Sequence, residues 1–210
     1  MHETLPIEST SRLRAVVSAR FKQSMSVPEA FFEAEVEQIA QACWAMAKRF
    51  HQGGRLLAFG NGAAATDAQH ISVEFVHPVI VGKRALPALA LTNDNSSLSR
   101  EYASFGDRIA VLARSQDIAL GLSPDGNCAN VLEALERAHR LGMLTVGLAG
   151  GDGGGMLHAE LNYRFVVHSS DAFAVQETHE TLYHVLWELV HVFFEHEGLL
   201  SNVEGVDHAI

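Results

Sequence analysis

The sequence predicts an α/β protein in which a parallel β-sheet is covered by helices on both faces. Five short apolar segments are each followed by Gly, Asn, Asp or Ser, and most of them then lead into a helical pattern. Because these segments are apolar throughout rather than alternating, we expect strands that are buried on both faces, as in parallel sheets. The predicted strands are 55–59, 86–92, 118–123, 144–149 and 163–167.

Two helices are expected ahead of the first strand, at residues 12–24 and 28–52. In the second, apolar residues recur at helical spacing, Pro28 marks its start and Gly53 its end. The last helix, about 173–196, is apolar on more than one face. That breadth favours contact with a second subunit as well as with its own sheet.

Length and composition indicate one domain with a helical appendage. The chain has 210 residues, of which 48% are hydrophobic and 19% charged, and a chain of this size can bury a core without a disulfide or a metal. We expect an N-terminal helical segment at 1–27, one domain at 28–200 and a flexible tail at 201–210.

Charge and cysteine content exclude several classes of protein. Lys and Arg number 15 against 25 Asp and Glu, a net charge of −10, which argues against nucleic acid or an anionic membrane surface as the main partner. Cys43 and Cys128 lie far apart and form no metal-binding or redox pair motif. No signal peptide and no transmembrane segment are recognisable, so a cytoplasmic location is expected.

Three polar loops follow successive predicted strands. They occupy residues 60–65, 92–97 and 123–128. In a parallel sheet such loops meet at one edge, where ligands bind. The Gly-rich first loop is suited to an anion or a polyol oxygen at a helix N-terminus, or is simply a tight turn that needs glycine. It matches neither the dinucleotide-binding motif nor the P-loop, so dehydrogenase and NTPase functions lack their motifs.

Histidine and carboxylate side chains form two stripes at helical spacing. His70 and Glu74 are four residues apart and point the same way, and Gln176, Glu180 and His184 repeat that spacing on the last helix. If the two helices meet, His70, Glu74, Gln176 and His184 can surround one cation such as zinc, or act as general acid and base. The alternatives are that His70 and Glu74 form a solvated pair on the surface of one helix, and that His184 is a core histidine with its hydrogen bonds satisfied.

Other histidines carry less information. The chain contains 12 in all. His191 and His196 are expected at the surface or at an interface, and His179, three residues after Gln176, is an additional candidate for the site.

Taken together, several motifs resemble those of the phosphoheptose isomerases. The matching residues are Gly60-Asn61-Gly62, Asp67-Ala-Gln-His70 with Glu74, Ser123 with Gly126-Asn127, and Gln176-Glu177-x-His179 with His184. These isomerases are sugar-isomerase (SIS) domain proteins that convert sedoheptulose 7-phosphate to a heptose 7-phosphate. Over about residues 28–197, the resemblance implies a three-layer αβα SIS fold with a five-stranded parallel sheet. It also implies a homotetramer with sites between subunits.

The resemblance also implies roles for individual residues. Glu74 would be the base that moves a proton between C1 and C2 of the sugar, and His184 the acid that serves the carbonyl oxygen. In zinc-bearing members the matching ligands would be His70, Glu74, Gln176 and His184. The residues expected to contact the substrate are Asn61, Gly62, Asp94, Ser123, Asp125, Asn127 and Gln176.

Departures from the family pattern gather at the phosphate-binding end. Ala64 stands where the family has a phosphate-binding serine, and the loop after the third strand keeps one hydroxyl of four. In that loop Pro124 has no N–H to offer, and Asp125 would place a negative charge against a phosphate. Ala174 and Pro78 stand where basic residues are expected. The histidine–carboxylate end is kept and the phosphate end is largely lost.

Three functions therefore remain open at the level of the sequence. One is the aldose–ketose isomerisation of the family, through an enediol or enediolate. The second is the same proton transfer on an unphosphorylated or differently charged polyol. The third is a non-catalytic SIS module that binds a partner protein or a regulatory sugar and holds a structural metal.

Overall fold

A five-stranded, all-parallel sheet forms the centre of the computed structural model, which describes residues 7–91, 105–196 and 198–201. The strand order is β2-β1-β3-β4-β5. The strands are β1 (Leu56–Gly60), β2 (Ala88–Ala90), β3 (Ile118–Ser123), β4 (Leu144–Gly150) and β5 (Tyr163–Val167). The predicted parallel α/β sheet is confirmed.

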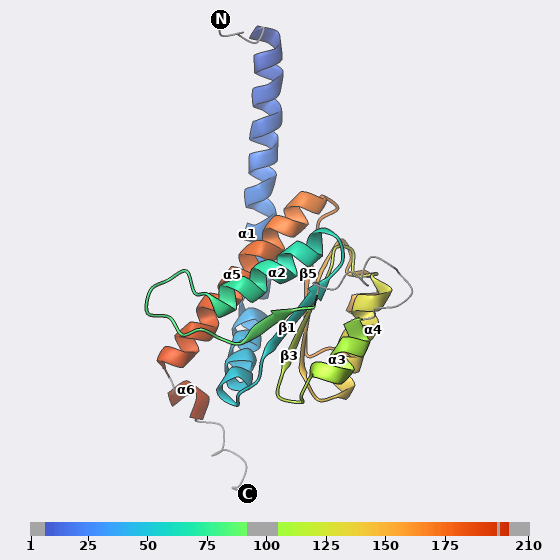
Figure 1. Cartoon of the computed structure of the whole chain (residues 1–210). Coiled ribbons are helices and arrows are strands. Elements are labelled where there is room, and N and C mark those ends of the chain that lie inside the picture. Colours follow the sequence, from blue (N-terminus) through green and yellow to red (C-terminus); the bar gives the residue numbers. More distant parts are fainter. Residues whose placement is uncertain (1–6, 92–104, 197, 202–210) are drawn as a thin grey trace, which may run out of the picture.

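Helices cover both faces of this sheet and make three layers (Figure 1). One face carries α1 (Ile7–His51), α2 (Ala63–Val76) and α5 (Ala172–Glu195). The other carries α3 (Phe105–Leu112), α4 (Ala129–Arg140) and the short 3-10 helix η2 (Gly154–Leu157). A last short helix, α6 (Gly198–Ser201), follows α5. Each face has its own apolar core, because every central strand is buried on both sides.

The strand boundaries follow the apolar segments closely. β3 and β5 have the predicted bounds, β1 is shifted by one residue at both ends, and β4 is one residue longer than predicted. β2 is shorter than the predicted 86–92. It starts later because Pro87 has no N–H to donate to a neighbouring strand, and residue 92 lies outside the described residues. The chain still runs beside β1 at Pro87, since Leu56 N–H donates to the Pro87 carbonyl at 2.9 Å.

The prediction of two N-terminal helices, 12–24 and 28–52, is wrong, because α1 continues through Pro28 as one helix. A proline inside a helix costs about 3 kcal/mol, and contacts on both sides of it offset that cost. Before Pro28, Arg20 forms ion pairs with Asp171 at 2.7 Å and with Glu177 at 2.8 Å. After it, Phe31 is buried in the core.

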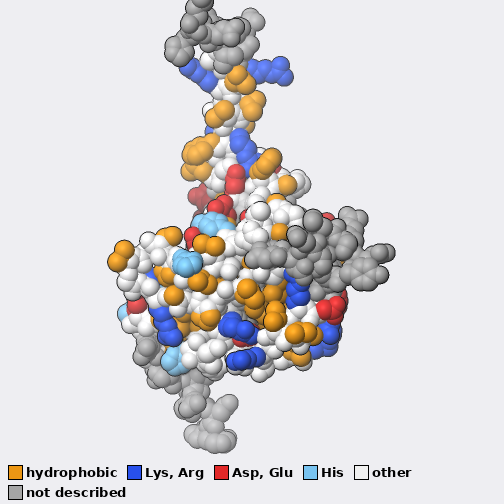
Figure 2. Space-filling view, in the orientation of Figure 1, with side chains coloured by type: hydrophobic (Ala, Val, Ile, Leu, Met, Phe, Trp, Pro, Cys, Tyr) orange, Lys and Arg blue, Asp and Glu red, His pale blue; other side chains and the backbone are white. Residues whose placement is uncertain are grey.

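The first part of α1 stands away from the sheet as an arm (Figure 1). Its apolar side chains are between 50% and 67% exposed, and Figure 2 shows hydrophobic side chains along it. These residues, called here the arm stripe, are Leu13, Val16, Val17, Phe21 and Met25. Among the described residues, no helix combines the length and the apolar character needed to cross a membrane.

Two further expectations meet the structure here. Cys43 and Cys128 are both free, as the absence of a pair motif predicts. The expectation that His191 lies at the surface is wrong for the single chain, in which it is buried. Its two ring nitrogens lie 2.8 Å and 2.9 Å from the carbonyl oxygens of Trp187 and Arg84. The predicted tail lies outside the described residues from 202 onward.

Candidate active site

The loops after β1 and β3 leave the middle of the sheet in opposite directions, which makes the edge between them a topological switch point. Gly60 ends β1 so close to α2 that a Cβ there would lie 2.8 Å from the Ala64 Cβ. This close approach brings the first turn of α2 against the sheet. The site is built where α2 meets α5 beyond this edge.

Two histidines from facing helices flank one carboxylate in this site. His70 and Glu74 lie on α2 and His184 lies on α5. The Glu74 carboxylate is 3.3 Å from His70 Nε2 through one oxygen and 3.5 Å from His184 Nε2 through the other. Its side chain is only 15% exposed, whereas the histidine side chains are about 40% exposed. The structure therefore brings together three of the four residues that the spacing placed around one cation or substrate.

A tyrosine orients one of these imidazoles. The hydroxyl of Tyr183, which is 1% exposed, lies 2.8 Å from His70 Nδ1, and its ring packs edge-on against the rings of His70 and His184. Burial raises the pKa of Tyr183, so its hydroxyl stays protonated. Since Nδ1 is occupied by this hydrogen bond, Nε2 is the His70 nitrogen that faces Glu74.

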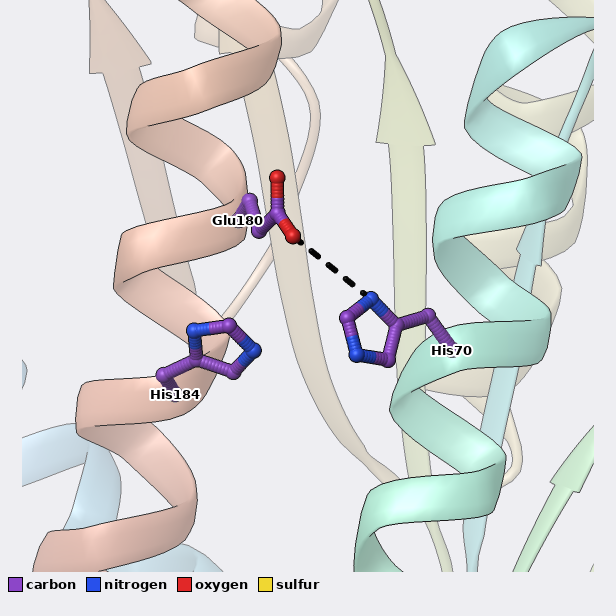
Figure 3. Close-up of side chains that lie close together, drawn as sticks. All are labelled: His70, Glu180 and His184. Atoms are coloured by element: carbon purple, nitrogen blue, oxygen red, sulfur yellow. Dashed lines mark ion pairs between the residues drawn. The ribbon is translucent and has the colours of Figure 1, made fainter.

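A second carboxylate adds to a candidate cation site. His70, Glu180 and His184 each offer one ligand atom, and these atoms lie within 4.8 Å of one another. Figure 3 shows Glu180 and His184 on α5 directed toward His70 on α2, with Glu180 Oε1 3.8 Å from His70 Nδ1. His184 Nε2 is buried and makes no hydrogen bond within the described part of the chain. Two imidazoles with carboxylates are a donor set that suits zinc, and the unbonded nitrogen fits a missing ligand bond.

Gln176, the fourth predicted residue, is held by a different partner. Its amide Nε2 donates to the two carboxylate oxygens of Asp67, at 3.1 Å and 3.4 Å. Asp67 is 9% exposed, and burial raises its pKa while the Gln176 hydrogen bond acts in the opposite direction. This contact ties the first turns of α2 and α5 together, one helical turn from His70.

Asn61, a predicted substrate-binding residue of the first loop, is bonded to Asn130 in the first turn of α4. The side-chain amides of Asn61 and Asn130 exchange two hydrogen bonds, at 2.8 Å and 3.0 Å. Gly62 is the N-cap of α2, with a φ of 57° that favours glycine, and no side chain caps this helix. Asp94 lies outside the described residues.

Polar groups of the loop after β3 bond mainly to one another. The Ser123 hydroxyl accepts from Cys128 N–H at 3.1 Å, and the Asp125 carboxylate accepts from Asn127 N–H at 2.9 Å. Asn127 Oδ1 accepts from Gly155 N–H at 3.0 Å, which fixes the loop to the turn after β4. Hydrogen bonds within the loop and to Gly155 therefore hold its conformation.

Sequence reasoning did not assign Asp67, Tyr183 and Glu180 to the site. Glu180 lies in the stripe with Gln176 and His184, and Asp67 precedes His70 by three residues, so helical spacing carries a signal for both. No spacing marks Tyr183, because its contact with His70 depends on how α5 is rotated against α2.

The fold and this histidine–carboxylate site define a SIS-domain protein, and the SIS domain family model matches residues 21–150. The phosphoheptose isomerase of Desulfovibrio desulfuricans is 36% identical over 193 residues, which cover 89% of this chain and 91% of that protein. The phosphoheptose isomerase of Aquifex aeolicus is 38% identical over 176 residues, which cover 81% of this chain and 92% of that protein.

A solved structure agrees with these relatives. The structure of phosphoheptose isomerase GmhA from Neisseria gonorrhoeae superposes on this chain with a TM-score of 0.76 at 31% sequence identity. The match covers 85% of this chain and 98% of the GmhA chain. The chain belongs to the phosphoheptose isomerase family of SIS-domain proteins.

Proposed function

We propose that this protein is an aldose–ketose isomerase that acts on a small sugar through an enediol or enediolate. The observation that carries the proposal is the Glu74 carboxylate, mostly covered and held between imidazoles of two facing helices. Its curated relatives are named phosphoheptose isomerase, which supports a sugar as the substrate.

Glu74 serves as the base in this proposal, and His184 as the acid. The carboxylate takes the proton from the carbon next to the carbonyl, while His184 gives a proton to the carbonyl oxygen. A C=C bond then joins C1 and C2. Glu74 returns its proton to the other carbon, and the hydroxyl there gives its proton back to His184 as the new carbonyl forms. The nearby ring of His70, held by Tyr183, keeps the carboxylate between the two helices.

We also propose a zinc ion as a partner of these residues. His70 and His184 would hold it together with Glu74 or Glu180, and Gln176 would join only after leaving Asp67. A histidine nitrogen that ligates zinc has no proton to give, so while His184 held the ion, zinc would polarise the carbonyl oxygen as a Lewis acid in place of proton donation by His184. Elemental analysis of the purified protein should find zinc, and His70→Ala should lose it. A metal-free wild type that stays folded and does not bind added zinc contradicts this part.

The same family supports a proposal for the assembly. We propose a homo-oligomer, a tetramer as the resemblance implies, with the domain at 28–200 and an arm at 1–27 that pairs with a second copy. The arm stripe supports this, since side chains of this size rarely stay exposed along one helix face without a partner. A cytoplasmic location remains part of the proposal.

Glu74→Gln tests the isomerase directly. With a panel of free and phosphorylated ketoses, the wild type should interconvert one aldose–ketose pair, and Glu74→Gln should lose about 100-fold or more of the rate, as loss of a general base does. Glu136→Gln is the matched control, because it removes a carboxylate that only pairs loosely with Arg140 on α4. No isomerisation of any sugar by the wild type would favour a binding module instead.

A further inference from the structure

The arm of α1 contacts the helix that carries His184. Arg20, on the arm, donates from Nη1 to the Asp171 carboxylate at 2.7 Å and from Nη2 to the Glu177 carboxylate at 2.8 Å. Its guanidinium also lies over the Phe173 ring, 5.3 Å from the ring centroid. One arginine therefore holds α5 at its N-cap and at two positions within its first two turns.

The Asp171 carboxylate has two partners at the same oxygen. Asp171 Oδ1 caps α5 by accepting from Ala174 N–H at 2.8 Å, and it also accepts from Arg20. A capping side chain fixes the first turn of a helix relative to the residue that carries the cap. Because Asp171 is itself held by Arg20, the start of α5 is tied to the arm.

Glu177 lies on the face of α5 that also carries His184. The two residues are seven apart in the chain, which is about two helical turns and about 10 Å along the helix axis. Side chains at this spacing project from one face of a helix. The ion pair at Glu177 therefore restrains the rotation of the face from which His184 reaches Glu74.

Small rotations of α5 matter for the proposed chemistry. Glu74 lies on α2 and His184 on α5, so the 3.5 Å between the Glu74 carboxylate and His184 Nε2 depends on how the two helices face each other. A side-chain tip lies about 5–6 Å from its helix axis, so a rotation of about 10° moves it by about 1 Å. A displacement of about 1 Å can cost about 100-fold in rate.

The shape of the guanidinium allows one residue to make both contacts. Its nitrogens lie in a rigid plane and can each meet a different carboxylate, whereas the ammonium of lysine is a single point charge on a flexible stem. The side chains of Arg20, Asp171 and Glu177 are between 29% and 43% exposed. Ion pairs this exposed add little to overall stability, so the main consequence of the contact is geometric.

We propose that Arg20 is a positioning residue of the isomerase, which holds α5 at the rotation where His184 meets Glu74. The proposal rests on the isomerase function proposed above. Arg20 acts through Asp171 and Glu177 and is not itself a catalytic residue. The arm is then part of the apparatus that aligns the site, in addition to its proposed pairing with a second copy.

Steady-state kinetics on the full-length protein test the proposal. With a sugar that the wild type isomerises, Arg20→Gln should lower kcat by about 10- to 100-fold. KM should change by less than about threefold, because most of the predicted substrate contacts lie in the loops after β1 and β3. Arg20→Lys should recover part of the rate, since lysine can pair with one carboxylate at a time.

A matched control and a direct measurement of the geometry accompany the kinetics. Arg14→Gln is the control, because Arg14 lies on the same arm and forms no ion pair with another described residue. In a crystal structure of Arg20→Gln, the distance from Glu74 to His184 Nε2 should exceed the present 3.5 Å by about 1 Å. The distance from Glu74 to His70 Nε2, within α2, should stay near 3.3 Å.

The outcomes separate this proposal from the isomerase function. In an active protein, an unchanged kcat or an unmoved His184 overturns the positioning role and leaves the isomerase standing. An equal loss of kcat in Arg14→Gln also overturns it, because the arm as a whole would then be the cause. If the wild type isomerises no sugar, the isomerase function fails, and the measured distance alone decides. A longer distance then supports alignment of α5 by Arg20, and an unchanged one overturns it.

Discussion

Replacing Tyr183 with Phe removes the hydrogen bond that orients His70 and leaves the shape of the side chain almost unchanged. The Tyr183 ring meets the rings of His70 and His184 at centroid distances of 5.3 Å and 4.9 Å, and Phe retains both contacts. Loss of one such hydrogen bond costs about 1 kcal/mol, which lowers Tm by about 2–4 °C in a chain of this size.

The larger effect is expected on zinc. A histidine ligand is held in place by the partner of its other ring nitrogen, and removing that partner lowers metal affinity by about 10- to 100-fold. Competition with a chelator of known zinc affinity measures the change, and circular dichroism on heating measures Tm. Tyr163→Phe is the matched control, since its hydroxyl donates to the Gln41 carbonyl at 3.3 Å, away from the site.

Two results would refute this reasoning. One is a Tyr183→Phe protein that binds zinc as tightly as the wild type. The other is equal weakening by Tyr163→Phe, which would show that the effect comes from general loss of stability rather than from the orientation of His70.

Three further predictions concern stability and assembly. Because burial lowers the pKa of His179 from 6.5 to about 4, the unfolded chain takes up a proton first as the pH falls. The free energy of unfolding should then drop by about 3 kcal/mol between pH 7 and pH 4. Urea titrations with the wild type and His179→Gln test this, and the same pH dependence in both proteins would count against it. Asp117 is fully buried and paired with Arg55 at 2.8 Å. Asp117→Asn should therefore lower the free energy of unfolding by about 2–3 kcal/mol. Chemical denaturation measures that loss, and no change in the midpoint would contradict it. The double substitution Val17→Glu and Phe21→Glu should convert the oligomer to a smaller species in analytical ultracentrifugation while the helix content is retained. An unaltered mass would rule the arm out as an interface.

The strands were predictable because burial on both faces leaves a direct trace in the sequence. Segments such as 118–123 and 163–167 are continuously apolar, and the structure reproduces both. α1 was not predictable in the same way. Pro28 is a local signal for a helix start, and the contacts that override it, from Arg20 to the first turns of α5, join residues about 150 apart in the chain.

The candidate site shows the same division. Spacing on single helices was enough to select His70, Glu74 and His184, and the structure places all three together. Spacing could not show that Gln176 turns to Asp67, since that pairing depends on how two helices pack at their first turns.

The continuity of α1 sets an angular relation between two parts of the molecule. A helix turns by about 100° and advances about 1.5 Å with each residue. The arm stripe, which ends at Met25, and the core residues that begin at Phe31 therefore have a fixed phase about one axis. Inserting a single residue between them would rotate the stripe by about a quarter of a turn without altering either surface. The orientation of any copy paired through the arm is thus set by the number of residues in this stretch, as well as by their chemistry.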